Sequence, residues 1–395
     1  MRIGIDATSW TNWRGFGRFT RSIVEALLAI DRDNEYVLFF DSTYPRCASV
    51  PSSARHIVVR TTAAQTEAIS VDGRRSAADL LQMAIAAARE PLDVFFCPSI
   101  DGYFPIIRRV ARVVMIHDVI PETLSEIMLP QAAARWRRRL KVKVAIRQAH
   151  ILATGSDDVR QQIVGIFGAA APRVAVIPYG VSARFRPPES LEAARQHVLG
   201  RHGVRAPYLL HVGGFGPHKN IPGLLESFAT LCGQPQHADV SLVFVGKRDD
   251  DEVYDEARRI DTLLEQRTLK NRVLFVGFQP DEELVPLYQA AEALVLVSLT
   301  EGFGLPAIEA VCCGTPAIVT SNSPLPAALG DAASVVDPLD PSGIVRAMEH
   351  ALSDRAARQR PVGRSDQFRW DASARTALTV FRRAFEISRN AGAAR

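Results

Sequence analysis

Short apolar runs alternate with longer amphipathic stretches along almost the whole chain, and this alternation limits the possible folds most strongly. Runs such as "DVFFC" (93–97) and "ALVLVS" (293–298) have the length and composition of buried strands. The stretch "SAADLLQMAIAAARE" (76–90) is typical of a helix, with Ser76 as its N-cap. Strands that alternate with helices form parallel βαβ units. The sequence therefore predicts an α/β protein with doubly wound parallel sheets.

The alternation occurs twice, which predicts two Rossmann-like domains that face a central cleft. A segment with Pro187-Pro188, several charges and an expected short helix, 186–206, separates domains at 1–185 and 207–367 as a linker. We expect strands at 2–7, 35–40, 56–60, 93–97, 112–118, 150–155, 208–213, 240–246, 272–277, 293–298, 316–320 and 334–338. We expect helices at 17–30, 76–90, 221–232, 251–268 and 342–353. Clefts between domains are common substrate sites.

Composition excludes several classes of protein. The chain has 395 residues, of which 47% are hydrophobic and 23% charged, as in ordinary globular proteins. Its apolar runs are far shorter than the roughly 20 residues of a membrane span, and "MRIGIDATSW" indicates a strand rather than a signal peptide. The five cysteines have no CxxC spacing, which indicates reduced core thiols and a cytoplasmic location. Residues 1–199 carry 26 Lys and Arg against 19 Asp and Glu, so the first half is basic.

The loop "TEGFGLPAIEA" (300–310) follows a predicted strand and begins a helix. Gly302, Phe303 and Gly304 form a tight turn, and Pro306 suits the first turn of a helix. The free N–H groups and the dipole of such a helix bind anions, for example a diphosphate. Glu301 and Glu309 flank the turn, where their carboxylates would accept hydrogen bonds from hydroxyl groups. The loop therefore predicts a ligand with a phosphate part and a hydroxyl-rich part; the alternative is two structural glutamates.

Two further glycine loops follow predicted strands. In "HVGGFGPHKN" (211–220), Gly213 and Gly214 precede Lys219 at a helix start, a position where a cation is favourable only with an anion nearby. Lys219 is therefore either a phosphate ligand or a solvated lysine. In "WRGFGRFTR" (13–21), Gly15 and Gly17 lack the third glycine of the dinucleotide fingerprint, and Arg18 follows them. A dehydrogenase is thus disfavoured.

These motifs together resemble those of retaining GT-B glycosyltransferases of family 4, in the branch of bacterial mannosyltransferases of polysaccharide assembly. "EGFGLPAIEA" resembles the E-x7-E motif, "GGFGPHKN" the diphosphate loop, "GFGRF" the N-terminal turn and "VVMIHDVIPE" the strand that ends in His-Asp. "CGTPAIVT" and "GDAASVVDP" resemble downstream strands, so the similarity covers nearly the whole chain. The resemblance also implies that a C-terminal helix at 368–395 crosses back to the first domain.

The resemblance implies a role for each matching residue. His117, Lys219 and Glu301 would be catalytic: His117 beside the donor sugar, Lys219 on the diphosphate and Glu301 on the sugar hydroxyls. Glu309 would bind the ribose. The donor-binding set would comprise Gly15, Gly17, Arg18, Gly213, Gly214, His218, Lys219, Gly246, Lys247, Gly277, Phe278, Glu301, Gly302, Phe303, Gly304, Leu305 and Glu309. Neither a metal nor a cofactor is expected, since the nucleotide-sugar is a substrate.

The chain departs from the family pattern at two places. Many relatives carry an arginine where this sequence has Gly213, Gly214 and His218, and a glutamate where it has Ala327. Either Arg18 supplies the missing positive charge, or His218 makes donor binding sensitive to pH. These departures leave the identity of the donor open.

The expected function is transfer of a hexose, with GDP-mannose as the expected donor, to a glycan or lipid-linked acceptor in surface polysaccharide or glycolipid assembly. The alternatives are a nucleotide-sugar epimerase or hydrolase on the same scaffold, and a non-catalytic nucleotide-sugar-binding subunit. The basic stretch "AARWRRRLKVKVAIRQAH" (133–150) is either a peripheral contact with the inner membrane face or a solvated helix. We expect no nucleic-acid partner. The sequence leaves the oligomeric state open.

Overall fold

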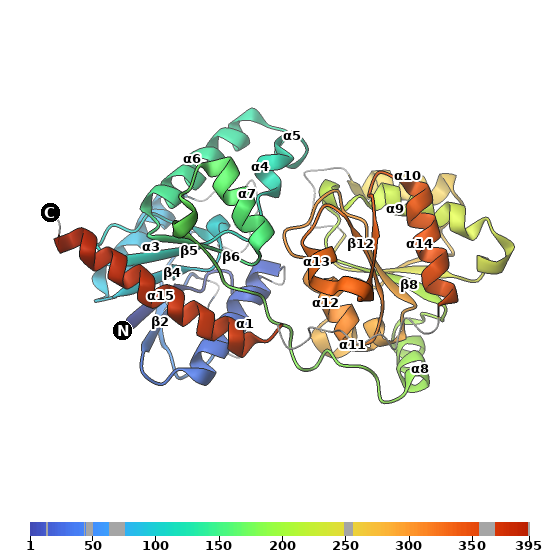
Figure 1. Ribbon diagram of the computed structural model, residues 1–395, viewed down its shortest axis with the longest axis horizontal. Helices are drawn as coiled ribbons and strands as arrows, with labels where there is room; N and C mark the ends of the chain where they lie inside the picture. The colour runs from blue at the N-terminus through green and yellow to red at the C-terminus, as the bar shows by residue number, and fades with distance from the viewer. Residues whose placement is uncertain are drawn as a thin grey trace. The chain divides into compact units, whose positions relative to one another are not determined.

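The computed structural model describes residues 1–12, 15–42, 44, 50–62, 76–248, 256–354 and 368–393 (Figure 1). Its chain divides into two compact units, one formed by Met1–Gly180 with Gln367–Arg395 and the other by Val181–Asp366. In each unit helices flank a parallel sheet. The two-domain α/β architecture predicted from the alternation of strands and helices is confirmed.

The first unit contains a seven-stranded sheet in the order β3-β2-β1-β4-β5-β6-β7, and all neighbouring pairs are parallel. Most of its strand residues are fully buried, because helices cover the sheet. The strands are β1 (Arg2–Asp6), β2 (Glu35–Phe40), β3 (Arg55–Val58), β4 (Val94–Cys97), β5 (Ala111–Met115), β6 (Ile151–Thr154) and β7 (Val174–Val176). The helices are α1 (Gly15–Ile30), α3 (Ala77–Arg89), α4 (Ile120–Thr123), α5 (Ser125–Met128), α6 (Ala132–Gln148), α7 (Asp157–Phe167) and α15 (Trp370–Ala393).

The C-terminal helix α15 belongs to the first unit. It packs against α1 and β5, and Phe381 lies against Phe96 of β4 with 5.1 Å between ring centroids. Ala374, Ala377 and Phe381 on its inner face are fully buried. Its amphipathic pattern therefore closes the core of the first unit.

The second unit contains a six-stranded parallel sheet in the order β10-β9-β8-β11-β12-β13. The strands are β8 (Tyr208–Val212), β9 (Ser241–Val245), β10 (Val273–Phe275), β11 (Ala293–Leu296), β12 (Ala317–Thr320) and β13 (Ala333–Val336). The helices are α8 (Leu191–His202), α9 (Ile221–Cys232), α10 (Glu256–Gln266), α11 (Asp281–Ala290), α12 (Leu305–Cys312), α13 (Leu325–Leu329) and α14 (Pro341–Ser353).

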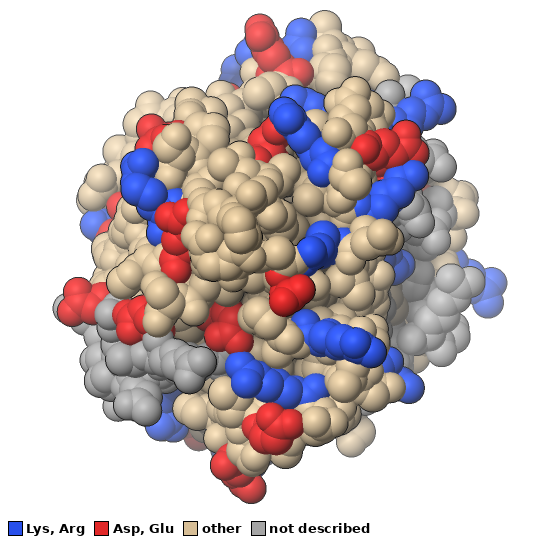
Figure 2. Space-filling view, turned by 90° about the vertical axis from the view of Figure 1, so that its right-hand side faces the viewer, with Lys and Arg blue, Asp and Glu red and all other residues tan. Residues whose placement is uncertain are grey.

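Charges on the surface of the second unit are paired locally. In the view of Figure 2, Lys and Arg side chains are intermingled with Asp and Glu side chains. Arg248 pairs with Asp261 at 2.6 Å and Arg267 with Glu226 at 2.6 Å. Such exposed pairs contribute little stability each, typically less than about 1 kcal/mol.

The structure differs from the sequence prediction in a few elements. Strand β7 was not predicted, because "VAV" is too short to stand out as an apolar run. Strand β5 ends at Met115, so His117 lies in the loop after it. The short helix expected in the segment 186–206 is α8, but it packs against α11 as part of the second unit. The first residues of the predicted helix 251–268 lie outside the described residues.

The cysteines and the helices bear on two other sequence predictions. Cys97, Cys232, Cys312 and Cys313 form no disulfide with one another, whereas Cys47 lies outside the described residues. Burial, and then the nearby Glu309 carboxylate, raise the pKa of Cys312 to about 11, so this thiol stays protonated.

Within the described part of the chain, we find no helix with the length and hydropathy that crossing a membrane requires.

Candidate active site

Strand order places a topological switch point in the second unit between the loops that follow β8 and β11. These two strands are hydrogen-bonded neighbours, yet the chain continues to β9 on one side and to β12 on the other. In open parallel sheets, ligands bind beyond the carboxyl ends of the strands at such a switch point. The loops at this point are the two that the sequence singled out, the glycine loop after β8 and the loop that leads into α12.

An ion pair joins the two loops. The Lys219 ammonium lies 2.7 Å from Oε1 of Glu301, and Ser298 Oγ donates to the same oxygen at 2.6 Å. Glu301 is buried, with 7% of its side chain exposed, and Lys219 is 18% exposed. The sequence predicted both charged residues for the site but neither their direct contact nor the role of Ser298. Among the described residues, both hydrogen bonds to this carboxylate end on Oε1.

The charges around Glu301 keep it ionised. Burial alone would raise its pKa, but the Lys219 ammonium, His218 and the hydrogen bonds from Lys219 and Ser298 outweigh burial and lower the pKa below the usual value of 4.5. His218 behaves differently, because burial and then Lys219 lower its pKa to about 4. The ring is therefore neutral at neutral pH, which disfavours the alternative that His218 makes donor binding sensitive to pH.

Backbone and side-chain hydrogen bonds fix the two loops relative to each other. The N–H of Leu299 donates to the carbonyl of His218 at 2.8 Å. Asn220, the N-cap of α9, has a left-handed backbone with φ 54°. Its Nδ2 donates to the carbonyls of Val297 at 3.2 Å and Pro338 at 2.9 Å. Lys219 directly precedes Asn220. These hydrogen bonds therefore hold Lys219 next to the loop that follows β11.

Close packing requires glycine at two positions near these loops. Gly246 follows β9 with φ 149°, and a Cβ there would lie 1.9 Å from the Gly213 carbonyl oxygen. Gly304 has φ 83°, and a Cβ there would lie 2.6 Å from Leu325 Cδ1. Side chains at these positions would displace the loops, because both the space and the backbone conformation favour glycine.

Glu309 lies one turn inside α12 and is almost completely buried, with 1% exposed. Tyr288 donates its hydroxyl to Glu309 Oε2 at 3.0 Å, and Thr315 Oγ1 in turn donates to the carbonyl of Tyr288 at 2.6 Å. Sequence reasoning missed Tyr288, because 21 residues separate it from Glu309. The turn from Gly302 to Leu305 precedes Glu309 and is partly exposed.

The remaining predicted residues of the second unit surround the ends of β8, β9 and β10. Gly214 and Lys247 are exposed, and Phe278 is 39% exposed. Gly277 has φ 72°, and its carbonyl accepts from the N–H of Gly246 at 2.9 Å. His211, which sequence reasoning missed, is fully buried in β8 and donates from Nδ1 to the Val295 carbonyl at 2.9 Å. Burial lowers the pKa of His211 to about 4.

His117 lies in the first unit, two residues after β5. Its Nδ1 is 2.6 Å from the hydroxyl of Tyr179, and Phe19 of α1 packs edge-on against its ring. Burial lowers the pKa of His117 to about 4, although the Asp101 carboxylate acts in the opposite direction. Sequence reasoning missed Tyr179, which lies 62 residues away.

The N-terminal turn lies at the start of α1. Gly15 is the first residue of the helix, and Arg18 is partly exposed. Gly17 is buried, and a Cβ there would lie 2.0 Å from the Asn12 carbonyl oxygen. These residues and His117 belong to the first unit, whereas Lys219 and Glu301 belong to the second.

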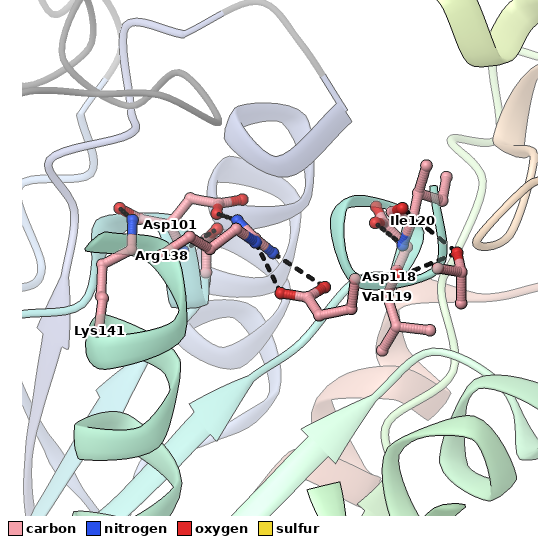
Figure 3. Close-up of polar contacts among 9 residues, drawn as sticks. Asp101, Asp118, Val119, Ile120, Arg138 and Lys141 are labelled. Carbon is pink, nitrogen blue, oxygen red and sulfur yellow. Dashed lines mark hydrogen bonds and ion pairs between the residues drawn. The ribbon is translucent and has the colours of Figure 1, made fainter. Parts of the chain in front are cut away.

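A buried ion cluster orders the segment that follows His117. Figure 3 shows the Arg138 guanidinium next to Asp101, with Lys141 on the same helix, α6. Arg138 donates to Asp101 Oδ1 at 2.7 Å and to Glu122 Oε1 at 2.6 Å, and Lys141 Nζ donates to the Asp101 carbonyl at 3.2 Å. Arg138 is only 5% exposed. Asp118 accepts from the N–H of Ile120 at 3.0 Å, and burial and then Asp101 raise the pKa of Asp118 to about 6.

The ion cluster removes two basic residues of the stretch 133–150 from the predicted membrane contact. Arg138 and Lys141 are engaged with the interior of the unit rather than available to a surface. Trp136 and Leu140 are instead exposed, at 64% and 48%, and exposed Arg139 and Lys143 lie within one helical turn of Leu140. No group of three or more His, Cys, Asp or Glu side chains that could hold a metal ion occurs among the described residues.

Comparison with solved structures gives the class of fold. The sucrose-phosphate synthase of Thermosynechococcus elongatus matches with a TM-score of 0.74 and 21% identity, covering 98% of this chain and 99% of that one. HepE of Anabaena in complex with UDP-glucose matches with a TM-score of 0.75 and 18% identity, covering 96% and 99%. The glycosyltransferase WaaG of lipopolysaccharide biosynthesis matches with a TM-score of 0.69. The two parallel-sheet domains are those of the GT-B fold.

Sequence comparison gives the family. Residues 200–367 match the family described as glycosyl transferases group 1. The O-antigen chain mannosyltransferase B of Escherichia coli is 30% identical over 268 residues, which cover 66% of this chain and 67% of that protein. The serotype-specific mannosyltransferase WbdA of Escherichia coli is 27% identical over 286 residues, but this chain spans only about a third of it. The chain belongs to the group 1 glycosyltransferases.

Proposed function

We propose that the protein is a retaining hexosyltransferase that transfers mannose from GDP-mannose to a glycan or lipid-linked acceptor in surface polysaccharide or glycolipid assembly. The relatives named as an O-antigen chain mannosyltransferase and a serotype-specific mannosyltransferase support the choice of sugar, and the first of these names supports the choice of pathway class. The nucleotide-sugar is the substrate, and the proposed reaction requires neither a metal nor another cofactor.

One observation carries this proposal: Lys219, Glu301 and Ser298 meet at the switch point of the second sheet. A sugar diphosphate presents negative charge next to hydroxyl groups, and this site offers an ammonium next to a carboxylate. Lys219 would bind the diphosphate together with the N–H groups at the start of α12. Glu301 Oε2 would accept hydrogen bonds from the sugar hydroxyls, and Glu309 would bind the ribose.

The proposed mechanism follows from the charges that develop. Cleavage of the bond between the sugar and the phosphate gives the anomeric carbon oxocarbenium character and adds charge to the departing diphosphate. Lys219 and the helix dipole would stabilise that charge, which is often the largest single contribution to catalysis. Double displacement would require a carboxylate nucleophile next to the anomeric carbon, and we assign Glu301 to the hydroxyls instead. The acceptor would therefore attack on the face that the diphosphate leaves, and the donor phosphate would take its proton.

The proposed acceptor side is the first unit, with α6 as a membrane contact. Exposed Trp136 and Leu140 together with Arg139 and Lys143 form a surface that combines apolar and cationic side chains, as in interfacial helices. We call these four residues the α6 face. A peripheral location at an anionic membrane would suit a lipid-linked acceptor.

A transfer assay with the purified protein tests the proposed function. GDP-, UDP-, ADP- and dTDP-linked sugars are first compared by thermal shift, because a ligand that binds only the folded state raises the apparent Tm. The best donor is then incubated with acceptor glycans, with and without EDTA, and the product anomer is assigned by NMR. Retention that is insensitive to EDTA supports the proposal, whereas inversion, or turnover of the donor that does not require an acceptor, contradicts it.

A further inference from the structure

A serine hydroxyl buried beside Glu301 contacts one oxygen of its carboxylate. Ser298 lies two residues after the end of β11 and is fully buried, with 0% exposed. Its Oγ donates to Glu301 Oε1 at 2.6 Å, and the Lys219 ammonium reaches the same oxygen at 2.7 Å. Among the described residues, no side chain or backbone group donates to Oε2 of Glu301. The carboxylate is thus held through one oxygen and presents the other.

Neighbouring loops fix the backbone between Ser298 and Glu301. The N–H of Leu299 donates to the His218 carbonyl at 2.8 Å, and the Leu299 carbonyl accepts from Asn322 Nδ2 at 3.2 Å. The N–H of Glu301 donates to the Asn322 carbonyl at 3.3 Å. The segment is therefore tied to the loops that follow β8 and β12. The freedom that remains is the rotation of the Glu301 carboxylate, and the contacts to Oε1 limit that rotation.

The two groups that donate to Oε1 differ in the number of protons they offer. An ammonium has three N–H donors, whereas a hydroxyl has one. Lys219 can therefore turn N–H groups toward a bound diphosphate, whereas Ser298 commits its single proton to Glu301. The 2.6 Å separation is typical of a short, strong hydrogen bond from a hydroxyl to an ionised carboxylate. The contact from Ser298 is thus the one that does not depend on whether a diphosphate is bound.

The orientation of the carboxylate decides what it can bind. An ionised carboxylate only accepts hydrogen bonds, with about two lone-pair sites on each oxygen. Ser298 and Lys219 fill those of Glu301 Oε1, so the open acceptor sites belong to Oε2. A group that donates, such as a sugar hydroxyl, fits these sites. A group that only accepts, such as a sugar ring oxygen or a phosphate oxygen, is repelled.

We propose that Ser298 is a positioning residue that fixes Glu301 Oε1, so that Oε2 selects donors with an unsubstituted hydroxyl on the sugar. This inference rests on the proposed function, because that function places the sugar hydroxyls on Glu301. It adds a residue that determines specificity without touching the ligand. The substrate class is a nucleoside diphosphate sugar whose hydroxyl toward Oε2 is free, rather than methylated, acylated or missing.

Equilibrium binding of GDP-mannose and of GDP tests whether Ser298 acts on the sugar, because GDP lacks the sugar. We expect Ser298→Ala to weaken binding of GDP-mannose about tenfold, as loss of a hydrogen bond to an ionised group would, and to leave GDP affinity unchanged. In the Glu301→Ala background, Ser298→Ala should cause no further loss. Ser227→Ala is the matched control, since Ser227 of α9 is also fully buried and donates to the Gly223 carbonyl at 2.9 Å. It should leave both affinities unchanged.

Two binding results would overturn the inference. Equal losses of affinity for GDP and GDP-mannose in Ser298→Ala would indicate a merely structural role, and native affinity of this variant for GDP-mannose would show that the hydroxyl has no effect on the sugar.

A crystal structure of Lys219→Met without ligand gives a readout that does not depend on the donor. We expect Glu301 Oε1 to stay within hydrogen-bond distance of Ser298 Oγ after the ammonium is removed. A carboxylate that turns away from Ser298 would overturn the inference. If the native protein bound neither nucleotide and transferred no sugar, the proposed function would fail, while this structure would still decide whether Ser298 holds the carboxylate.

Discussion

Lys219 and Glu301 form an ion pair of 2.7 Å across the switch point of the second sheet, although 82 residues separate them in the sequence. The strand order places the ends of β8 and β11 side by side, so each of the two following loops contributes one charge to the same site. Without a ligand, each charge neutralises the other. A bound sugar diphosphate would engage both, which makes the pair the centre of the proposed site.

Removal of either charge should impair catalysis. We expect Lys219→Ala and Glu301→Gln each to lower kcat with saturating donor about 10²-fold or more, since each deletes a preorganised electrostatic contact. Lys270→Ala is the matched control, because Lys270 pairs at 2.7 Å with the exposed Glu265. Initial rates with saturating donor provide the measurement. Near-normal turnover in both site variants would refute these roles.

Stability should depend on pH through four histidines whose pKa the fold lowers. His117, His150, His211 and His218 have pKa values of about 4 in the folded protein and 6.5 as the reference value. Between these values the unfolded chain binds more protons, so stability rises with pH from 4 to 6.5 and changes little above pH 7. His117, His211 and His218 each contribute up to about 3 kcal/mol to this dependence, and the half-buried His150 contributes less.

The apparent Tm from pH 4.5 to 8 measures this effect, and His218→Gln should flatten the curve. Glu301 should contribute little to the change of Tm in this range. Its pKa is lower in the folded protein than in the unfolded chain, so the stabilisation that it provides is lost only below about pH 4.5. Donor affinity should stay constant from pH 6.5 to 8. A Tm that does not change between pH 7 and 4.5 would contradict the prediction that these histidines stay neutral in the folded protein.

Arg138 should be far more important for stability than the neighbouring arginine on α6. Arg138→Met leaves the carboxylates of Asp101 and Glu122 without their buried partner, and removal of one partner from such a pair costs about 3–5 kcal/mol. Arg139→Met, at an exposed position of the same helix, should cost little. Urea unfolding monitored in parallel for both variants provides the comparison.

Replacing the whole cluster gives a further check on its charge balance. The triple change Asp101→Asn, Glu122→Gln and Arg138→Met removes all three charges and should recover part of the lost stability. Equal stabilities of Arg138→Met and Arg139→Met would show that the cluster contributes nothing measurable.

The α6 face should mediate binding to anionic vesicles. We expect Arg139→Glu with Lys143→Glu to abolish flotation with vesicles that contain phosphatidylglycerol, since each basic residue near such a surface contributes about 1 kcal/mol. Trp136→Ala with Leu140→Ala should weaken binding through lost apolar contact. Arg32→Glu with Arg382→Glu makes the same charge change elsewhere on the unit and should leave flotation intact. Similar flotation of all these variants would exclude the α6 face as the contact.

The sequence was sufficient to predict the parts of this structure that depend on local patterns. Apolar runs that alternate with helical segments specify parallel sheets, and glycine loops after strands such as β8 specify where backbone packs closely. A close approach such as that of Gly246 to the Gly213 carbonyl leaves a trace in the sequence, because no other residue fits there.

Contacts that depend on strand order could not be predicted in this way. The hydroxyls of Tyr179 and Tyr288 reach His117 and Glu309 from distant segments, and nothing local distinguishes them from other core tyrosines. Arg138 is one of six basic residues in a short stretch of α6, and only the burial of its position next to Asp101 and Glu122 distinguishes it from its neighbours. Periodicity indicates which face of a helix is apolar, but not which charge lies beneath a loop.

A crystal structure of the protein soaked with GDP tests the proposed donor site. We expect the diphosphate within hydrogen-bond distance of Lys219 Nζ and of the N–H groups between Gly302 and Leu305, with the ribose hydroxyls on Glu309. Nucleotide bound at a different place, or no nucleotide bound at saturating GDP while the Lys219–Glu301 pair remains intact, would refute this site.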